Sequence, residues 1–201
     1  MKREYNMNDI GTNVIETSRL ILRRFKQEDA YDVYKGWSSD IRLSSYVSWN
    51  IHTSIVEAEE LVSRRIEEYD RNAYNWVVEL RNSRELIGNI STVAIRRTHN
   101  NCEIGYCYGS QYWNKGYATE ALKAVIKYLF EKCDMHIIEA KYHSTNPASG
   151  KVLKKAGMTK EAILRERRYC CATDTYADLI YYSISKDEYN KKITQEYDYV
   201  Y

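Results

Sequence analysis

A short turn between two patterned segments carries the residues best suited to bind an anion. The stretch GSQYWNKGYATEALKAVIKYLFEKC, from Gly109 to Cys133, passes through a basic, glycine-containing turn into a predicted helix that begins near Tyr117. The first N–H groups of a helix have no partner within the helix and carry partial positive charge, so they attract anions. Gly116 lets a ligand approach the backbone, and Lys115 adds a full charge. The turn therefore predicts a site for a phosphate-bearing ligand.

The turn does not match the common nucleotide-binding motifs. The spacing GxxxxGK[ST] is absent, which excludes a P-loop, and only one of the three Rossmann glycines has a counterpart. The alternative interpretation is an ordinary strand-to-helix connection, because the apolar residues after the turn follow helical spacing. These residues are Ala118, Ala121, Leu122, Val125 and Leu129. The stripe accounts for the helix but leaves the basic turn unexplained.

The rest of the chain predicts the strands and helices that must hold this turn. Alternating apolar segments predict strands over residues 19–25, 74–80, 86–97, 102–109, 136–143, 161–169 and 176–184. Helical periodicity predicts helices over residues 27–39, 55–71, about 117–133 and 149–157. Short turns join the strands between residues 74 and 109, so these strands are expected to be antiparallel neighbours. The order predicts an α/β or α+β fold with a mixed sheet covered by helices.

Composition and charge limit the classes of protein to consider. The chain has 201 residues, of which 30 are basic and 28 acidic, and it has a single proline and no Gly/Ser-rich linker. We therefore expect one domain over residues 15–186, with an N-terminal extension over 1–14 and a Tyr-rich C-terminal tail over 187–201. The net charge of +2 gives no indication of a nucleic-acid or membrane-surface partner.

Cysteine and histidine spacing indicates neither a disulfide framework nor a metal site. The five cysteines form no CxxC pair, and the four histidines show no close pair with metal-ligand spacing. The N-terminus is polar, without the apolar segment of a signal peptide, and no run approaches the ~18 apolar residues of a membrane span. These patterns predict a cytoplasmic protein with reduced thiols and no bound metal.

Three further segments flank the turn: ETSRLILRRF near the start, EIGYCY before it and NPASGKVLKKAGM after it. Together with YWNKGYATEAL, they resemble the GNAT N-acetyltransferases of the RimJ/RimL type over residues 15–185. The turn is similar to that family's acyl-CoA pyrophosphate loop, Q/R-x-x-G-x-G/A, with Trp113, Gly116 and Ala118 in the three defined positions. The subfamily has glycine where this chain has Asn114, and asparagine tolerates left-handed dihedral angles better than most residues.

The resemblance implies a GNAT fold, with a mostly antiparallel central sheet of about seven strands covered by about four helices. It also implies acetyl-CoA as co-substrate and no metal. The pyrophosphate is expected on the N–H groups between residues 111 and 119, and the pantetheine beside the strand over 102–108, like an added strand. The expected cofactor-binding residues are Tyr106, Cys107, Tyr108, Gln111, Trp113, Asn114, Lys115, Gly116, Tyr117, Ala118, Thr119, Asn146 and Ser149.

Acetyl transfer from a thioester to an amine needs a base, an oxyanion donor and an acid. Glu103 is the candidate base or water-orienting group, although a solvent-facing strand glutamate is the alternative. A main-chain N–H near Tyr106 or Cys107 is the candidate oxyanion donor.

Many GNAT enzymes use a tyrosine as the acid, at the position of Leu153 in this chain. The resemblance implies that Ser149 takes this role and that Asn146 braces the cofactor. The alternative for both is a plain turn with a helix N-cap. Cys107 has no neighbour in sequence that would activate it as a nucleophile, so direct attack is expected.

The acceptor is expected to be a protein N-terminal α-amine, which costs about 1 kcal/mol to neutralise at pH 7, against about 4–5 for a lysine-type amine. A small-molecule amine, such as a polyamine or an antibiotic, is the alternative. A CoA-binding regulator without catalysis is a third, and a homodimer is left open. Trp37, Tyr46 and Trp49 lie where relatives build one wall of the acceptor cleft, although a helix end with aromatic packing is the preferred interpretation of each one.

Overall fold

The computed structural model describes residues 7–47, 49–170 and 174–198, with side chains as far as residue 192. The described strands form one sheet of eight, in the order β1-β2-β3-β4-β5-β6-β8-β7. Their bounds are β1 Ile15–Glu16, β2 Leu20–Arg23, β3 Asn75–Leu80, β4 Leu86–Arg96, β5 Asn101–Tyr108, β6 Ile137–His143, β7 Thr159–Cys170 and β8 Thr175–Ser185. Among these strands, β5 and β6 are the one parallel pair. The predicted mixed, mostly antiparallel sheet is confirmed.

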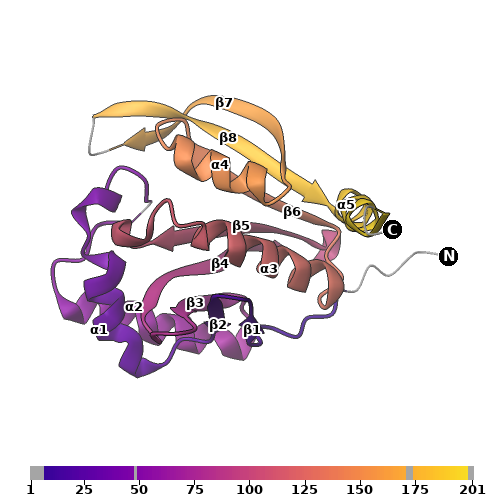
Figure 1. Cartoon of the computed structure of the whole chain (residues 1–201). Helices are drawn as coiled ribbons and strands as arrows, with labels where there is room; N and C mark the ends of the chain where they lie inside the picture. The colour runs from indigo at the N-terminus through magenta and orange to yellow at the C-terminus, as the bar shows by residue number, and fades with distance from the viewer. Residues whose placement is uncertain (1–6, 48, 171–173, 199–201) are drawn as a thin grey trace.

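Helices cover both faces of the sheet. Their bounds are α1 Ala30–Val33, α2 Ile55–Glu67, α3 Tyr117–Glu131, α4 Pro147–Lys155 and α5 Lys186–Asp198. In Figure 1, α3 lies along β4 and β5, and α4 lies beside β6 and β8. Alternate residues of β3 divide between two cores: Trp76 and Val78 pack with α3, whereas Val77 packs with α1 and α2. Since successive strand residues point to opposite faces, α3 and the α1–α2 pair lie on opposite sides of the sheet.

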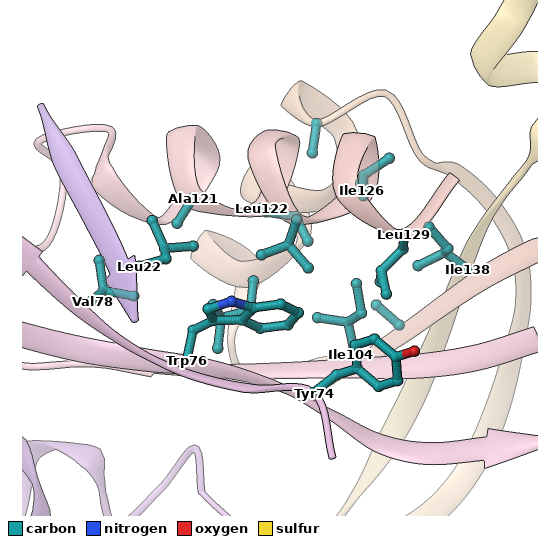
Figure 2. Packing of buried hydrophobic residues seen from close by; sticks show 14 of the residues in the cluster. Leu22, Tyr74, Trp76, Val78, Ile104, Ala121, Leu122, Ile126, Leu129 and Ile138 are labelled. Carbon is teal, nitrogen blue, oxygen red and sulfur yellow. The ribbon is translucent and has the colours of Figure 1, made fainter. Parts of the chain in front are cut away.

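The core beneath α3 fixes the helix that follows the basic turn. Figure 2 shows Trp76 and Ile104 of the sheet facing Leu122 and Leu129 of the helix. All four side chains are at most 2% exposed. Burying a side chain of this size contributes roughly 1.5–3 kcal/mol, so the apolar stripe seen in the sequence holds α3 against the sheet.

Two elements exceed the predicted seven strands and four helices. β1 has two residues, too few to give a periodic signal. The segment expected as a tail contains α5, which contacts α3: the Tyr189 and Phe130 ring centroids are 5.0 Å apart, and the Tyr189 hydroxyl donates to Glu131 at 2.8 Å. Within the described residues, no helix is long and apolar enough to cross a membrane.

The sheet opens between β5 and β6. The two strands pair in parallel from Asn101↔Ile137 to Ile104↔Ala140. Beyond these pairs, the described residues of the two strands no longer pair, and β6 continues beside β8 alone. Residues 105–108 of β5 therefore keep their pairing with β4 but have no strand on their other edge. We call this opening the β5–β6 gap.

Candidate active site

The turn before α3 presents a run of free N–H groups. A 3-10 turn after β5 uses the N–H of Tyr112, which donates to the Gly109 carbonyl at 2.9 Å, and the N–H of Trp113, which donates to Ser110 at 3.2 Å. The first helical bond runs from Glu120 N–H to the Gly116 carbonyl at 3.0 Å. Among the described residues, none accepts from the N–H groups of residues 114–119. We call this run the amide cradle, and it is narrower than the predicted 111–119.

The cradle owes its shape to two left-handed residues. Asn114 has a φ of 60° and Gly116 has a φ of 82°. The asparagine thus adopts the left-handed conformation that its residue type tolerates. Successive N–H groups that turn toward one point form an anion-binding concavity. Tyr117, Ala118 and Thr119 complete it as the first residues of α3.

Side chains from distant elements brace the turn. The Gln111 side-chain amide donates to the Gly36 carbonyl at 3.1 Å, and the Trp113 indole N–H donates to the Tyr108 carbonyl at 2.8 Å. A Cβ at Gly109 would lie 2.2 Å from the Gly36 carbonyl oxygen, so only glycine allows this close approach. The turn is therefore held in place before any ligand binds.

Asp40 anchors the start of the turn as a charged group. Its carboxylate accepts from Ser110 N–H at 3.3 Å and from Arg42 Nε at 2.8 Å. Burial acts to raise the pKa of Asp40, but the hydrogen bonds from Arg42 and Ser110 outweigh it and lower the pKa to about 2. Asp40 is therefore ionised at physiological pH and keeps Ser110 fixed.

Arg19 adds a second cation beside the cradle, and no pattern in the sequence predicted this role. Its Nε lies 2.6 Å from Glu120, its Nη1 donates to the Lys115 carbonyl at 3.1 Å, and its guanidinium stacks 4.7 Å from the Tyr117 ring centroid. A Cβ at Gly116 would lie 3.4 Å from Arg19 Nη2. Glu120 offsets the charge of Arg19, so Lys115 and the free N–H groups supply the positive charge that favours a diphosphate.

Tyr106 and Ser149 meet across the β5–β6 gap. The Asn146 side chain caps α4 by accepting from Ser149 N–H at 3.2 Å. The Tyr106 hydroxyl lies 2.8 Å from Ser149 Oγ and 3.2 Å from the Ser149 carbonyl oxygen. Burial raises the pKa of the Tyr106 hydroxyl, so it stays protonated. The structure therefore brings a predicted acid into contact with a strand residue on the edge of the gap.

The Asn146 cap supports a stability prediction. Asn146→Ala is expected to lower the free energy of unfolding by about 1 kcal/mol, because Ser149 N–H at the start of α4 would lose its side-chain acceptor and keep only the main-chain carbonyl of position 146, at 3.1 Å. Chemical denaturation of both proteins measures the change. Asn146→Asp keeps an acceptor at the cap and should lose less, and equal stability of all three would show that the cap contributes little.

Glu103 lies on the other face of the sheet from Tyr106 and Ser149. Its carboxylate pairs with Lys141 Nζ at 2.9 Å, and the Glu103 side chain is 12% exposed. It precedes the gap, at the level of Glu139 on β6. The described contacts do not join Glu103 to Ser149, so the two predicted catalytic groups would act from opposite faces of the sheet.

His143 was not a predicted site residue, yet it ends β6 at the gap. Burial lowers the pKa of its imidazole, and the nearby charge of Arg168 lowers it further, so the ring is neutral near pH 7. Its Nδ1 lies 3.8 Å from Cys170 Sγ. The one sequence sign was its position immediately before the STNPAS turn.

The three aromatic residues expected in an acceptor wall have different positions. Trp37 is 1% exposed in the core beneath α1 and α2, so it lines no surface. The rings of Tyr46 and Trp113 make an edge contact with centroids 6.0 Å apart, which brings the loop before α2 against the residue that precedes the cradle. Trp49 packs on His52 with centroids 5.5 Å apart.

Cys107 and Tyr108, at the end of β5, could contribute main-chain groups to a site but not reactive side chains. Burial raises the pKa of the Cys107 thiol, which keeps it protonated and poorly nucleophilic. The Tyr108 side chain is buried in the core beneath α3. In the part of the chain that the structure describes, no three His, Cys, Asp or Glu side chains group as metal ligands.

Comparison with known protein families shows which family this chain belongs to. The family model described as Acetyltransferase (GNAT) domain matches residues 19–159, which include the cradle, the gap and the start of α4. The chain belongs to the GNAT acetyltransferase family. Its activity class is therefore acetyl transfer, and the predicted family is confirmed.

Individual relatives agree with this GNAT assignment. The uncharacterized N-acetyltransferase YoaA of Bacillus subtilis is 32% identical over 174 residues, covering 86% of this chain and 97% of YoaA. The [ribosomal protein uS5]-alanine N-acetyltransferase of Escherichia coli is 35% identical over 85 residues, covering 41% of this chain and 43% of that enzyme. A solved complex of RimL, a ribosomal alpha-N-protein acetyltransferase, with coenzyme A superposes with a TM-score of 0.77 at 21% identity, covering 86% of this chain and 98% of RimL. This last likeness supports the fold.

Proposed function

We propose that this GNAT protein is an acetyl-CoA-dependent N-acetyltransferase that moves the acetyl group to a primary amine by direct attack. The observation that carries the proposal is the amide cradle beside the unpaired edge of β5. The cradle would hold the diphosphate, and residues 105–108 would pair with the pantetheine amides as if with an added strand. The thioester would then lie in the β5–β6 gap.

Residues around the gap supply the groups that the transfer requires. The amine nitrogen would attack the thioester carbonyl carbon while the C–S bond breaks, with a main-chain N–H of Tyr106 or Cys107 stabilising the carbonyl oxygen. Ser149 Oγ would donate a proton to the leaving thiolate. The Tyr106 hydroxyl, 2.8 Å away, orients Ser149 Oγ. Because the Cys107 thiol stays protonated, direct attack is favoured over an acetyl-cysteine intermediate.

Glu103 is the proposed base. It lies on the face of the sheet opposite α3, which we call the acceptor side because the amine would approach the gap from there. Its carboxylate would accept the proton that the amine loses, directly or through a water molecule. The ion pair with Lys141 holds the carboxylate in place beside the gap. An N-terminal α-amine requires little of this base, because it is partly neutral at pH 7 already.

Glu103→Gln tests this assignment. Because an amide cannot accept the proton that the amine loses, the Gln variant should have a lower kcat. The measurement is kcat for both proteins. Glu139→Gln is the matched control, because Glu139 lies opposite Glu103 on β6 and pairs with Arg96 at 2.9 Å. An unchanged kcat in Glu103→Gln would leave Glu103 with a structural ion pair only.

The proposed acceptor is a protein N-terminal α-amine, supported by the ribosomal-protein relative and by the low cost of neutralising such an amine. A thiol-release assay with acetyl-CoA should show turnover with peptides that begin with alanine or serine. Mass spectrometry should place the acetyl group on the α-amine. Peptides blocked at the N-terminus are the control and should give no release.

Two other outcomes of the same assay contradict the acceptor assignment. Turnover with polyamines or amino-sugar antibiotics but with no peptide would favour the small-molecule alternative. Tight CoA binding without turnover on any amine would favour a regulator that has lost catalysis, in line with the leucine at position 153 where many relatives have tyrosine.

A further inference from the structure

Arg168 reaches from β7 to the loop before α2 without an anionic partner. Its Nη2 donates to the Val47 carbonyl at 3.2 Å. Its Nε is buried and has no hydrogen-bond partner. Among the described residues, no carboxylate lies within ion-pair distance of its guanidinium, whereas the two other half-buried arginines, Arg23 and Arg65, each have one. A buried N–H of a cation without an acceptor is costly unless a ligand supplies one.

A bulge in β7 turns Arg168 toward this loop. Between the pairs Leu164↔Leu179 and Arg168↔Ala177, β7 has three residues where β8 has one. Glu166 in the bulge has a φ of 53°, and its N–H donates to Asp178 Oδ1 at 2.9 Å. Bulges of this kind redirect a side chain and are frequent next to active sites.

The surroundings of Arg168 lie on the acceptor side of the sheet. On β8, Tyr182 and Ile184 pack in the core beneath α3 and α4. Ala177 and Leu179 alternate with these residues along the strand and therefore lie on the opposite face. Arg168 pairs with Ala177 and His143 pairs with Leu179, so both belong to the opposite face, which also carries Glu103 and Lys141. β7 and β6 are separated by β8, which places their backbones about 10 Å apart. A group held by Arg168 would thus lie one or two residues from an amine in the gap.

We propose that Arg168 binds a carboxylate of the acceptor, so that the protein prefers amines that carry an acidic group close to the reacting nitrogen. The inference rests on the proposed N-acetyltransferase function and adds the substrate class. One N–H of Arg168 donates to the Val47 carbonyl, and the remaining N–H groups of the guanidinium, including Nε, bind the carboxylate. The carboxylate is either an acidic side chain near a peptide N-terminus or the α-carboxylate of a free amino acid.

Two matched pairs of acceptors test the preference and separate its sources. One pair is a peptide with Ala-Glu at its N-terminus and the same peptide with Ala-Gln; the other is alanine and alaninamide. For the unmodified enzyme, kcat/KM should favour the acidic member of at least one pair by about 10-fold, the ratio that 1.4 kcal/mol provides. Arg168→Gln should bring this ratio close to one. Arg167→Gln, in the exposed bulge of the same strand, should leave it unchanged.

A charge reversal separates recognition from a merely structural role of Arg168. Arg168→Glu should invert the preference, so that an Ala-Lys peptide is used better than the Ala-Glu peptide, which loss of loop structure alone would not cause. Equal use of both members of each pair by the unmodified enzyme would overturn this inference while leaving the proposed function intact. No turnover with any amine, together with intact CoA binding, would overturn both.

Discussion

Replacing Gly116 with tryptophan is expected to lower the affinity for CoA by at least ~100-fold, which corresponds to about 2.7 kcal/mol. Gly116 has a φ of 82°, a conformation that residues with a side chain rarely adopt. A Cβ there would already lie 3.4 Å from Arg19 Nη2, so an indole would extend over the amide cradle. Two lost hydrogen bonds to a charged phosphate, at about 1.5–3 kcal/mol each, are enough for the expected effect.

Isothermal titration calorimetry with CoA measures this loss, and Gly157→Trp provides the matched control. Gly157 also has a positive φ, of 91°, but it follows α4 at the end away from Ser149, and its nearest neighbours are atoms of Lys192. The control therefore introduces the same backbone strain outside the proposed site. Similar CoA affinity of Gly116→Trp and the unmodified protein would contradict the assignment of the cradle.

Ser149→Ala is expected to lower kcat by about 100-fold, within the range for loss of a general acid, while CoA affinity changes by less than about 3-fold. The binding of CoA should be preserved because the Asn146 side chain caps the main-chain N–H at position 149, which alanine keeps. Tyr106 would keep the carbonyl of position 149 as an acceptor, since its hydroxyl lies 3.2 Å from that oxygen. The variant should therefore remain folded.

Single-turnover kinetics and calorimetry separate the two effects of Ser149→Ala. Ser144→Ala is the control, because the Ser144 hydroxyl lies in the same connection and accepts from Asp178 N–H at 3.2 Å, on the β8 side. It should retain nearly full turnover. Unchanged kcat in Ser149→Ala would leave Ser149 as a part of the α4 N-terminus and would require another acid.

The sequence predicted the elements whose signals are local. The apolar stripe of α3 depends on residues within a few positions, and the structure has it. The N-cap at Asn146, the alternative interpretation of that residue, is also present, and Asn114 has the left-handed conformation that asparagine tolerates. The same holds for the antiparallel run of β3, β4 and β5, which short turns connect. In these places, residue type and spacing are sufficient to determine the local structure.

The features that the sequence did not reveal depend on contacts between distant residues. Arg19 reaches Lys115 across 96 positions, and Arg168 reaches Val47 across 121. The β5–β6 gap is a property of two strands that pair over only part of their length, which no pattern within either strand records. β1 and the packing of α5 on α3 are held by tertiary contacts rather than by their own periodicity.

The amide cradle and the β5–β6 gap are most directly tested by a crystal structure of the protein with bound CoA. The account predicts diphosphate oxygens within hydrogen-bond distance of the main-chain N–H groups of residues 114–119. It also predicts pantetheine amides paired with residues 105–108 of β5 and the thiol close to Ser149 Oγ. CoA bound elsewhere, with these N–H groups facing only solvent or a protein side chain, would contradict it.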